Sequence, residues 1–154
     1  MALSDMVDFV AYDEWGQLLL LAEVKGILDT SDDWVAKYRR NLLEHGTLPH
    51  VPFFLIATAE RMYFWHQDHH TSMEELPHFT MDATAELKPY FEKFEQTAES
   101  ARGEVLDLIL LTWLTDIAEY GHSRVNEDPS LKWLSESGLL DGLKRARIEL
   151  SAVQ

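Results

Sequence analysis

The first part of the chain alternates apolar runs with turn residues. Residues 8–12 alternate between apolar and polar positions and are rich in strand formers, while residues 18–24 form an almost continuous apolar run. Residues 13–16, which separate the two runs, are of the kinds that favour turns. The pattern predicts a β-hairpin.

A helix and two more strands are expected after the hairpin. Thr30 or Ser31 can cap a helix over residues 32–45. The inward stripe of this helix repeats at every fourth residue and consists of Trp34, Tyr38 and Leu42. Residues 51–58 and 61–66 predict two strands. The order strand, strand, helix, strand, strand indicates a mixed sheet of the α/β or α+β class.

The second half of the chain is predicted to be mainly helical. Residues 67–82 are polar and unpatterned, which predicts a surface loop. Pro89 fits the first turn of a helix that runs to about Ser100. The remaining expected segments are a second, more apolar helix over residues 104–120, short helical pieces over 131–143 and a last strand over 147–153.

Length and composition indicate one domain. The chain has 154 residues, of which 46% are hydrophobic, enough for one sizeable core. We expect a sheet-and-helix core over residues 6–66 and a helical extension with a terminal strand over residues 83–154. The start of the chain lacks a signal-peptide pattern, and the most apolar run, residues 105–118, is too short to span a membrane. No cysteine is present, so we expect a cytoplasmic protein without disulfides or thiolate metal sites.

The charge of the chain limits how it can bind nucleic acid. With 27 acidic and 13 basic residues, the net charge is −14. Residues 1–66 contain ten acids and five bases, a net charge of −5, which leaves −9 for residues 67–154. Nucleic-acid binding would therefore depend on a few well-placed cations, on metal ions or on a partner subunit.

Asp8, Glu23 and Lys25 carry the groups that phosphodiester cleavage requires. That chemistry uses converging carboxylates to hold a metal ion and a nearby cation to place the nucleophile. If the turn pairs Glu14 with Gln17, Asp8 lies directly opposite Glu23, and a register shifted by one pair makes them diagonal neighbours. In both registers the three side chains share one face of the sheet, whereas a three-residue turn would reverse that relation.

Two competing motifs are less suited to this role. Asp13 lies at the tip of the hairpin, too far from Glu23 to share a metal ion. A second Glu-x-Lys string, Glu86-Leu87-Lys88, stands just before Pro89 and has no acid-bearing strand beside it.

The hairpin resembles the core motif of the PD-(D/E)XK, or restriction-endonuclease-like, nuclease superfamily. The resemblance lies in Val7-Asp8, the apolar strand that follows the turn, and Glu23-Val24-Lys25-Gly26, and it extends over residues 6–66. Position 7 is valine where the family name gives proline. The family core begins with a helix and a first strand, and only six residues precede Val7 here, so we expect either that these elements are missing or that another segment replaces them, with residues 147–153, from this chain or a second copy, as one candidate.

The resemblance implies a Mg²⁺-dependent nuclease that acts on DNA, with Mn²⁺ as an alternative ion. It implies that Asp8 and Glu23 bind the metal, that the carbonyl of Val24 is a further ligand and that Lys25 orients the attacking water. Basic residues on the helix after the motif are candidate phosphate contacts. These are Lys37, Arg40 and, less directly, Arg39.

Several alternatives stand beside this interpretation. Asp8, Glu23 and Lys25 can instead form a solvated hairpin face with a cross-strand ion pair. The chain can also be a binding or assembly module without turnover or a regulatory, antitoxin-like partner of another protein. As a nuclease we expect it to be a homodimer, and self-association through the apolar helix is the alternative to packing that helix in the core. The four residues that best anchor that helix in a core are Leu110, Trp113, Leu114 and Ile117.

The histidines give a weaker signal. A contiguous set could supply ligands to zinc or nickel, but tight clustering in a turn rarely points several side chains at one ion. This set consists of His66, Asp68, His69 and His70. Four others have no recognisable nucleophile partner and are expected to be structural, namely His45, His50, His78 and His122.

Overall fold

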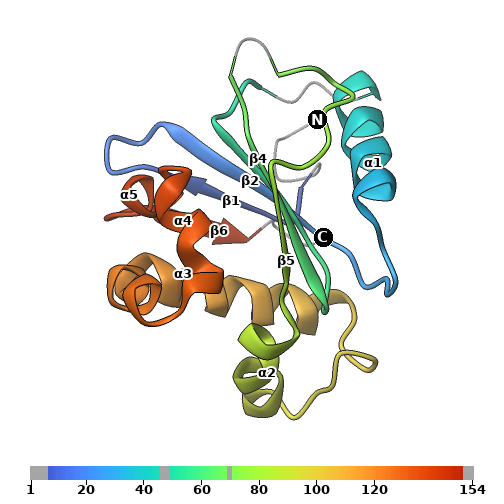
Figure 1. Cartoon of the computed structure of the whole chain (residues 1–154), viewed down its shortest axis with the longest axis vertical. Coiled ribbons are helices and arrows are strands. Elements are labelled where there is room, and N and C mark those ends of the chain that lie inside the picture. The colour runs from blue at the N-terminus through green and yellow to red at the C-terminus, as the bar shows by residue number, and fades with distance from the viewer. Residues whose placement is uncertain (1–6, 46–48, 69–70, 151–154) are drawn as a thin grey trace.

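A six-stranded mixed sheet with helices on both faces forms the protein (Figure 1). The computed structural model describes residues 7–45, 49–68 and 71–150. The strands are β1 (Phe9–Tyr12), β2 (Leu18–Val24), β3 (Phe53–Ala57), β4 (Arg61–His66), β5 (Phe79–Asp82) and β6 (Arg147–Leu150). The helices are α1 (Asp32–His45), α2 (Thr84–Lys93), α3 (Gly103–Glu127), α4 (Lys132–Glu136) and α5 (Leu139–Gly142), with a 3₁₀ turn over Pro129–Leu131. The mixed α/β class predicted from the sequence is confirmed.

The strands are arranged in the order β5-β4-β3-β2-β1-β6. β2 and β3 are parallel, so the chain must cross over between them, and α1 forms that crossover. The remaining neighbours are antiparallel. This topology puts the amino end of α1 just after the end of β2, where the Glu-x-Lys motif lies.

Side chains alternate between two apolar layers. Leu20, Ala22 and Val24 of β2 face the layer formed with α2, α3, α4 and α5. Leu21 faces the other layer, which contains Val35 of α1. Glu23 therefore belongs to the α1 side of the sheet.

Three elements differ from the sequence prediction, one of which is α3, since it ends at Glu127 rather than at Tyr120. The end of the predicted loop over residues 67–82 is the short edge strand β5, which pairs with β4. α2 begins at Thr84 and ends at Lys93, so Pro89 lies inside it rather than in its first turn. Leu87 and Phe91 are buried four residues apart, and this packing outweighs the backbone hydrogen bond that proline removes.

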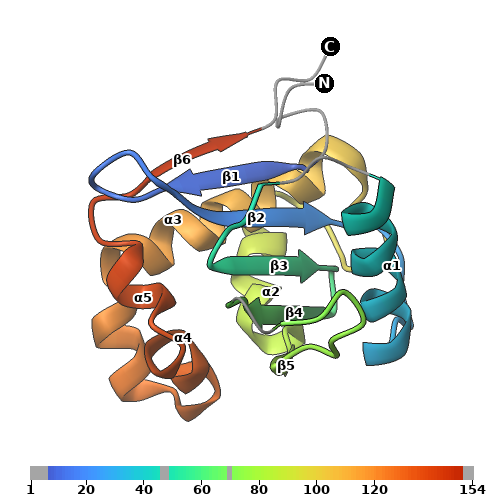
Figure 2. The same ribbon diagram turned by 90° about the horizontal axis from the view of Figure 1, so that it is seen from above.

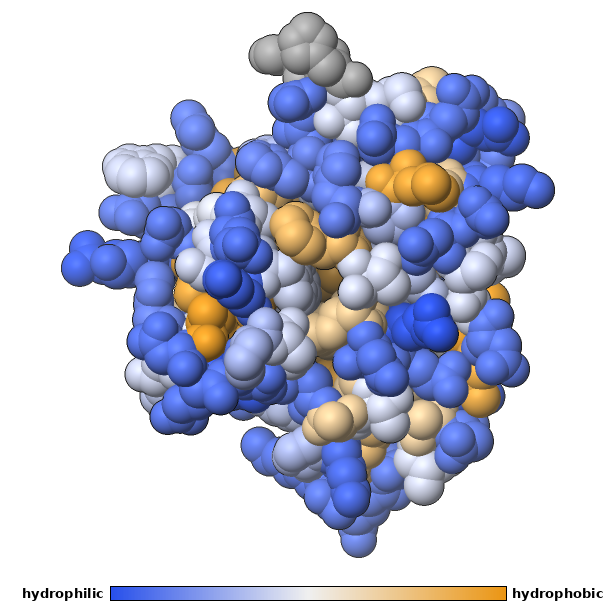
Figure 3. Space-filling view, in the orientation of Figure 1, coloured by the Kyte–Doolittle hydropathy of each residue, from blue (hydrophilic) through white to orange (hydrophobic). Residues whose placement is uncertain are grey.

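The long helix α3 fills the larger apolar layer. Its four predicted core residues, Leu110, Trp113, Leu114 and Ile117, are buried, which confirms the core interpretation. Among the described residues, none of the helices combines the length and apolarity needed to cross a membrane. On the face in Figure 3, apolar residues form small patches among hydrophilic ones.

β6 completes the sheet within the same chain, as the sequence hypothesis proposed. It pairs antiparallel with β1, with Phe9 opposite Leu150 and Tyr12 opposite Arg147 (Figure 2). Residues 151–153 of the predicted strand lie outside the described residues. The sheet thus draws its strands from both ends of the chain.

Candidate functional site

The hairpin turn has three residues, not two. The Asp13 amide donates to the Gln17 carbonyl at 2.8 Å across this turn. The Asp13 carboxylate accepts hydrogen bonds from the Trp15 and Gln17 amides at 3.0 and 2.9 Å. Gly16 has φ +81°, a left-handed conformation that glycine adopts without strain. Asp13 therefore fixes the turn, in agreement with its exclusion as a metal ligand.

A bulge in β2 corrects the register that this turn alone would impose. Tyr12 pairs with Leu18, but Ala11 pairs with Leu20, so Leu19 is an extra residue on β2. Without it, the three-residue turn would put the two carboxylates on opposite faces of the sheet. The turn prediction was wrong, while the relation that depended on it is preserved by the bulge.

The resulting register brings Asp8 beside Glu23. Phe9 pairs with Ala22, and continuing this register puts Asp8 next to Glu23, just outside β1. The Val24 amide donates to Asp8 Oδ2 at 2.6 Å. Since the amide and carbonyl of a strand residue point to the same side, the Val24 carbonyl also points toward the β1 side.

The two carboxyl groups are in contact. Glu23 is only 5% exposed and forms a side-chain hydrogen bond with Asp8. Burial, followed by the hydrogen bond and charge of Asp8, raises the pKa of Glu23 to about 9. Lys25 and Tyr38 oppose this shift. At neutral pH the pair therefore carries a proton, held on Glu23.

Tyr38 of α1 joins the site, although sequence reasoning identified it only as an inward-facing residue. Its hydroxyl donates to Glu23 Oε2 at 3.1 Å, and its ring stacks on Trp34 with centroids 5.6 Å apart. Lys25 Nζ lies 4.3 Å from the centroid of the same ring. A hydroxyl-bearing aromatic in an otherwise apolar stripe was the signal that could have identified it.

Lys25 stays charged in this environment. Burial lowers its pKa, but Tyr38, Glu23 and Asp8 together raise it by more, so the net pKa lies above the ordinary value. The side chain is half-buried and held over the Tyr38 ring. The site thus combines a protonated carboxyl pair with a fixed ammonium group.

Comparisons with protein families, curated proteins and solved structures find no match to this chain. The resemblance to PD-(D/E)XK nucleases therefore rests on the hairpin residues alone.

Asp107 is a second contributor that the sequence did not reveal. It lies on α3, and its pKa is raised to about 6 by burial, then by repulsion from Asp8 and Glu104, with Lys25 acting in the opposite direction. The charges of Asp8 and Lys25 therefore act on the pKa of this carboxylate, although Asp107 belongs to a helix of the other apolar layer. An acid within the most apolar helix was the corresponding signal in the sequence.

The donor set fits a hard divalent cation in kind. It consists of the carboxylates of Asp8 and Glu23 and the carbonyl of Val24, which are oxygen ligands of the type that Mg²⁺ prefers. Within the part of the chain that the structure describes, no three His, Asp or Glu side chains gather closely enough to hold a metal ion. Water or phosphate oxygens would have to complete the coordination.

The candidate phosphate contacts lie elsewhere on α1. Lys37 and Arg40 line a hollow of about 340 Å³ together with residues of the segment after β4, including Glu74 and Leu76. Because α1 turns by about 100° per residue, these side chains point away from the direction of Tyr38. The structure thus does not bring Lys37 and Arg40 together with the carboxyl pair.

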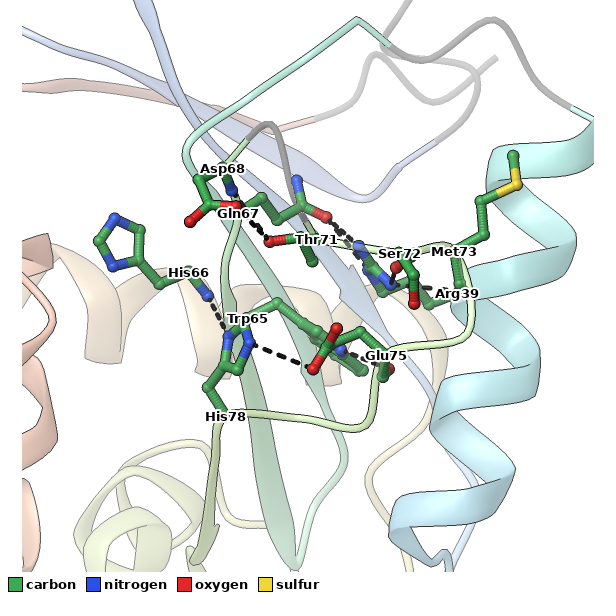
Figure 4. Close-up of polar contacts among 10 residues, drawn as sticks. All are labelled: Arg39, Trp65, His66, Gln67, Asp68, Thr71, Ser72, Met73, Glu75 and His78. Carbon is green, nitrogen blue, oxygen red and sulfur yellow. Dashed lines mark hydrogen bonds and ion pairs between the residues drawn. The ribbon is translucent and has the colours of Figure 1, made fainter.

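Arg39, the third basic residue of α1, is buried and has a structural role (Figure 4). Its guanidinium donates to Gln67 Oε1 at 2.7 and 3.1 Å and to the carbonyl of Ser72 at 3.0 Å. Burial lowers its pKa to about 10, which still leaves it charged. Arg39 therefore anchors the segment after β4 to α1 and is not a surface phosphate contact.

The candidate zinc or nickel set is only partly described. His66 stacks against Phe53, with centroids 4.9 Å apart, and its amide donates to His78 Nδ1 at 2.9 Å (Figure 4). His69 and His70 lie outside the described residues. His66 and His78 thus have packing and hydrogen-bonding roles.

The second Glu-x-Lys string lies in α2 and forms a structural ion pair. Glu86 accepts hydrogen bonds from Arg124 Nη1 and Nη2 at 2.6 and 2.8 Å and from Trp113 Nε1 at 2.7 Å. This contact joins α2 to α3, and Lys88 is exposed. The preference for the first string is consistent with this difference.

Proposed function

We propose that the chain is a metal-dependent phosphodiesterase of the PD-(D/E)XK type that acts on DNA. The observation that supports this proposal is the contact between the Asp8 and Glu23 carboxyl groups, with the charged Lys25 two residues further on the same face. Two carboxyl groups in contact, one buried and one half-buried, repel each other when both are ionised, so this arrangement costs stability. Such unfavourable pairs are concentrated at functional sites.

Asp8, Glu23 and the Val24 carbonyl would hold Mg²⁺ or Mn²⁺. When bound, a divalent cation offsets charge on phosphoryl oxygens and lowers the pKa of water. The net charge of −14 makes such an ion a means of bringing phosphate close to the chain.

The protein's own residues hold the reacting groups in place. The Val24 amide fixes the orientation of Asp8, and the Tyr38 hydroxyl fixes that of Glu23. Lys25 is confined over the Tyr38 ring, close to both carboxyl groups. From there its ammonium can orient an attacking water and stabilise charge that develops on the phosphate.

Titration calorimetry with Mn²⁺ tests the metal site. Wild type should bind the ion, and Glu23→Gln, which preserves the shape of the side chain, should weaken binding by at least about tenfold because one anionic ligand is lost. Glu14→Gln is the matched control, since Glu14 is exposed in the turn of the same hairpin. Equal affinities in wild type and Glu23→Gln would refute the proposal.

A second candidate is a binding or assembly module that retains the nuclease-like scaffold without turnover. The observation that favours it is the protonated Glu23, which leaves the free protein one carboxylate short at neutral pH. This candidate predicts that the protein does not nick supercoiled plasmid in Mn²⁺, whether or not it binds the ion. Nicking that depends on Lys25 would exclude it.

A further inference from the structure

Three basic residues lie close together near the carboxyl end of this acidic chain, as three others do on α1. Lys144, Arg145 and Arg147 are three of its 13 bases and fall within four consecutive positions. All three are exposed, and they form the turn between α5 and β6 and the first residue of that strand. Arg145 has φ +59°, an unfavourable value for a residue with a side chain, so this turn is held in a specific conformation.

The register of the sheet joins this basic segment to the tip of the hairpin. Arg147 is paired with Tyr12, and its guanidinium carbon lies 4.7 Å from the centroid of the Tyr12 ring. The beginning of β6 accordingly lies beside the turn between β1 and β2 (Figure 2). Arg147 also forms an ion pair with Glu149, so an incoming anion would compete with that carboxylate.

Trp15 adds an aromatic surface at the same tip. It is 77% exposed, the highest value among the large apolar side chains of the described residues. Its backbone conformation is fixed by two hydrogen bonds to Asp13. The Trp15 amide donates to the Asp13 carboxylate, and the Gly16 amide donates to the Asp13 carbonyl. Tryptophan is enriched at interfaces, because its large apolar ring can be covered by a partner while its N–H stays hydrogen-bonded.

The tip and the carboxyl pair lie on the same side of the sheet. Side chains of β1 alternate, so Tyr12, Val10 and Asp8 share the face that carries Glu23. Tyr12 and Asp8 are four residues apart, or about 13 Å along an extended strand. Tyr12 and Asp8 are thus separated by the length of only a few nucleotides, with the buried Val10 between them.

We propose that Trp15, Tyr12 and the basic segment 144–147 bind single-stranded nucleic acid and lead it to the Asp8–Glu23 pair. Aromatic rings that stack on bases, combined with cations that contact phosphates, are the usual means of holding single strands. The strand-binding surface stands by itself, while its role in delivering substrate rests on the proposed phosphodiesterase function.

A single strand fits this surface better than a duplex. Duplex binding relies on neutralising many phosphates, and three clustered cations on a chain of net charge −14 supply few such contacts. Glu23 is also recessed, so a flexible single strand can reach its carboxyl group more readily than a rigid duplex can. Exposed bases, which stacking on Trp15 requires, occur only when the strand is unpaired.

Fluorescence anisotropy in EDTA tests binding without cleavage. The probe is a labelled oligo(dT) of about 15 nucleotides, within the range of lengths that such surfaces cover. Trp15→Ala and Arg147→Glu should each weaken binding about tenfold, and Arg145→Glu should act in the same direction. Lys88→Glu, the same charge change at an exposed position of α2, should leave affinity within about twofold.

Tryptophan fluorescence gives a second readout. Stacking should quench wild type, and this quenching should disappear in Trp15→Phe. The other tryptophans are buried or half-buried, namely Trp34, Trp65, Trp113 and Trp133. Because Trp15 and the basic side chains are exposed, the variants should unfold at the wild-type temperature, which circular dichroism checks.

The outcomes separate this proposal from the proposed function. Failure of wild type to bind oligo(dT), tighter binding of a duplex than of the single strand, or equal weakening by Lys88→Glu would each overturn the strand-binding surface. Mn²⁺ binding that depends on Glu23 would still support the metal site in those cases. Oligo(dT) binding that depends on Trp15 and Arg147, with no Mn²⁺ binding, would support the surface and overturn the phosphodiesterase.

Discussion

The same Glu-x-Lys string occurs twice in this protein and forms two different environments. Both carboxyl groups are largely removed from solvent, since Glu23 as a whole residue is 5% exposed and the side chain of Glu86 is 6% exposed. Glu86 is met by a guanidinium and an indole, whereas Glu23 meets another carboxyl group and a tyrosine hydroxyl. The chemistry of the string is therefore set by partners that are distant in sequence. Glu86 is hydrogen-bonded to a cation, whereas Glu23 is hydrogen-bonded to an uncharged hydroxyl and to another carboxyl group.

The largest difference is expected at the two lysines. Lys25→Ala should reduce Mn²⁺-dependent nicking of supercoiled plasmid about 10³-fold, because a charged group positioned at the reacting phosphate is lost. Lys88→Ala should leave the rate unchanged, since Lys88 is exposed on α2. Gel electrophoresis of the nicked and supercoiled forms measures both. Equal rates for wild type and Lys25→Ala would remove Lys25 from the reaction.

Removing charge from Glu86 should destabilise the fold. Glu86→Gln leaves Arg124 without its carboxylate partner between α2 and α3, and we expect a loss of about 3 kcal/mol in the free energy of unfolding. Urea denaturation followed by circular dichroism measures this change. Glu92→Gln, at an exposed position of the same helix, is the control. A loss no larger than that of the control would show that the ion pair contributes little.

Replacing Glu23 by glutamine should have the opposite effect and stabilise the fold. Its pKa in the folded protein, about 9, lies above the ordinary value of 4.5, so the folded state binds more protons between these values. The stability that this group contributes is complete below pH 4.5 and is lost as the pH rises toward 9. Glu23→Gln should therefore be more stable than wild type by about 2 kcal/mol at pH 8, with little difference near pH 4. Urea denaturation at both pH values tests this, and a pH-independent difference would contradict it.

The smallest effect is expected at Tyr38. Tyr38→Phe keeps the ring under Lys25 but removes the hydroxyl that lowers the pKa of Glu23. The ionised form of Glu23 loses a donor, so Mn²⁺ affinity should fall about fivefold. Tyr12→Phe, which keeps its ring contact with Arg147 far from Glu23, is the matched control for calorimetry. Unchanged affinity in Tyr38→Phe would make the hydroxyl contact incidental.

Local patterns predicted much of the fold. The bounds of β2 and β4 match the apolar runs, and Ser31 accepts a hydrogen bond from the Trp34 amide at the start of α1, as the capping prediction required. Periodicity succeeded here because each of these elements buries one face or both. β5 was missed because an edge strand of four residues carries too few positions to show alternation.

The candidate site was predictable only in part. A three-residue turn and a bulge together bring Asp8 beside Glu23. A two-residue turn without a bulge would also keep both carboxylates on one face, so the sequence does not distinguish the two arrangements. Tyr38 and Asp107 approach from other elements, so their relation to Glu23 depends on how α1 and α3 pack. Sequence spacing carries no information about that packing.

The extra residue at Leu19 also determines how the hairpin tolerates changes in its length. A deletion of one residue in the turn or at Leu19 can be absorbed by removing the bulge, which leaves Asp8 opposite Glu23. An insertion in the turn can be absorbed as well, because a four-residue turn leaves the strand pairs beyond it unchanged. Natural variants of this protein that keep the site should therefore include hairpins that are one residue shorter and hairpins that are one residue longer, whereas the pairing of Asp8 with Glu23 should stay the same.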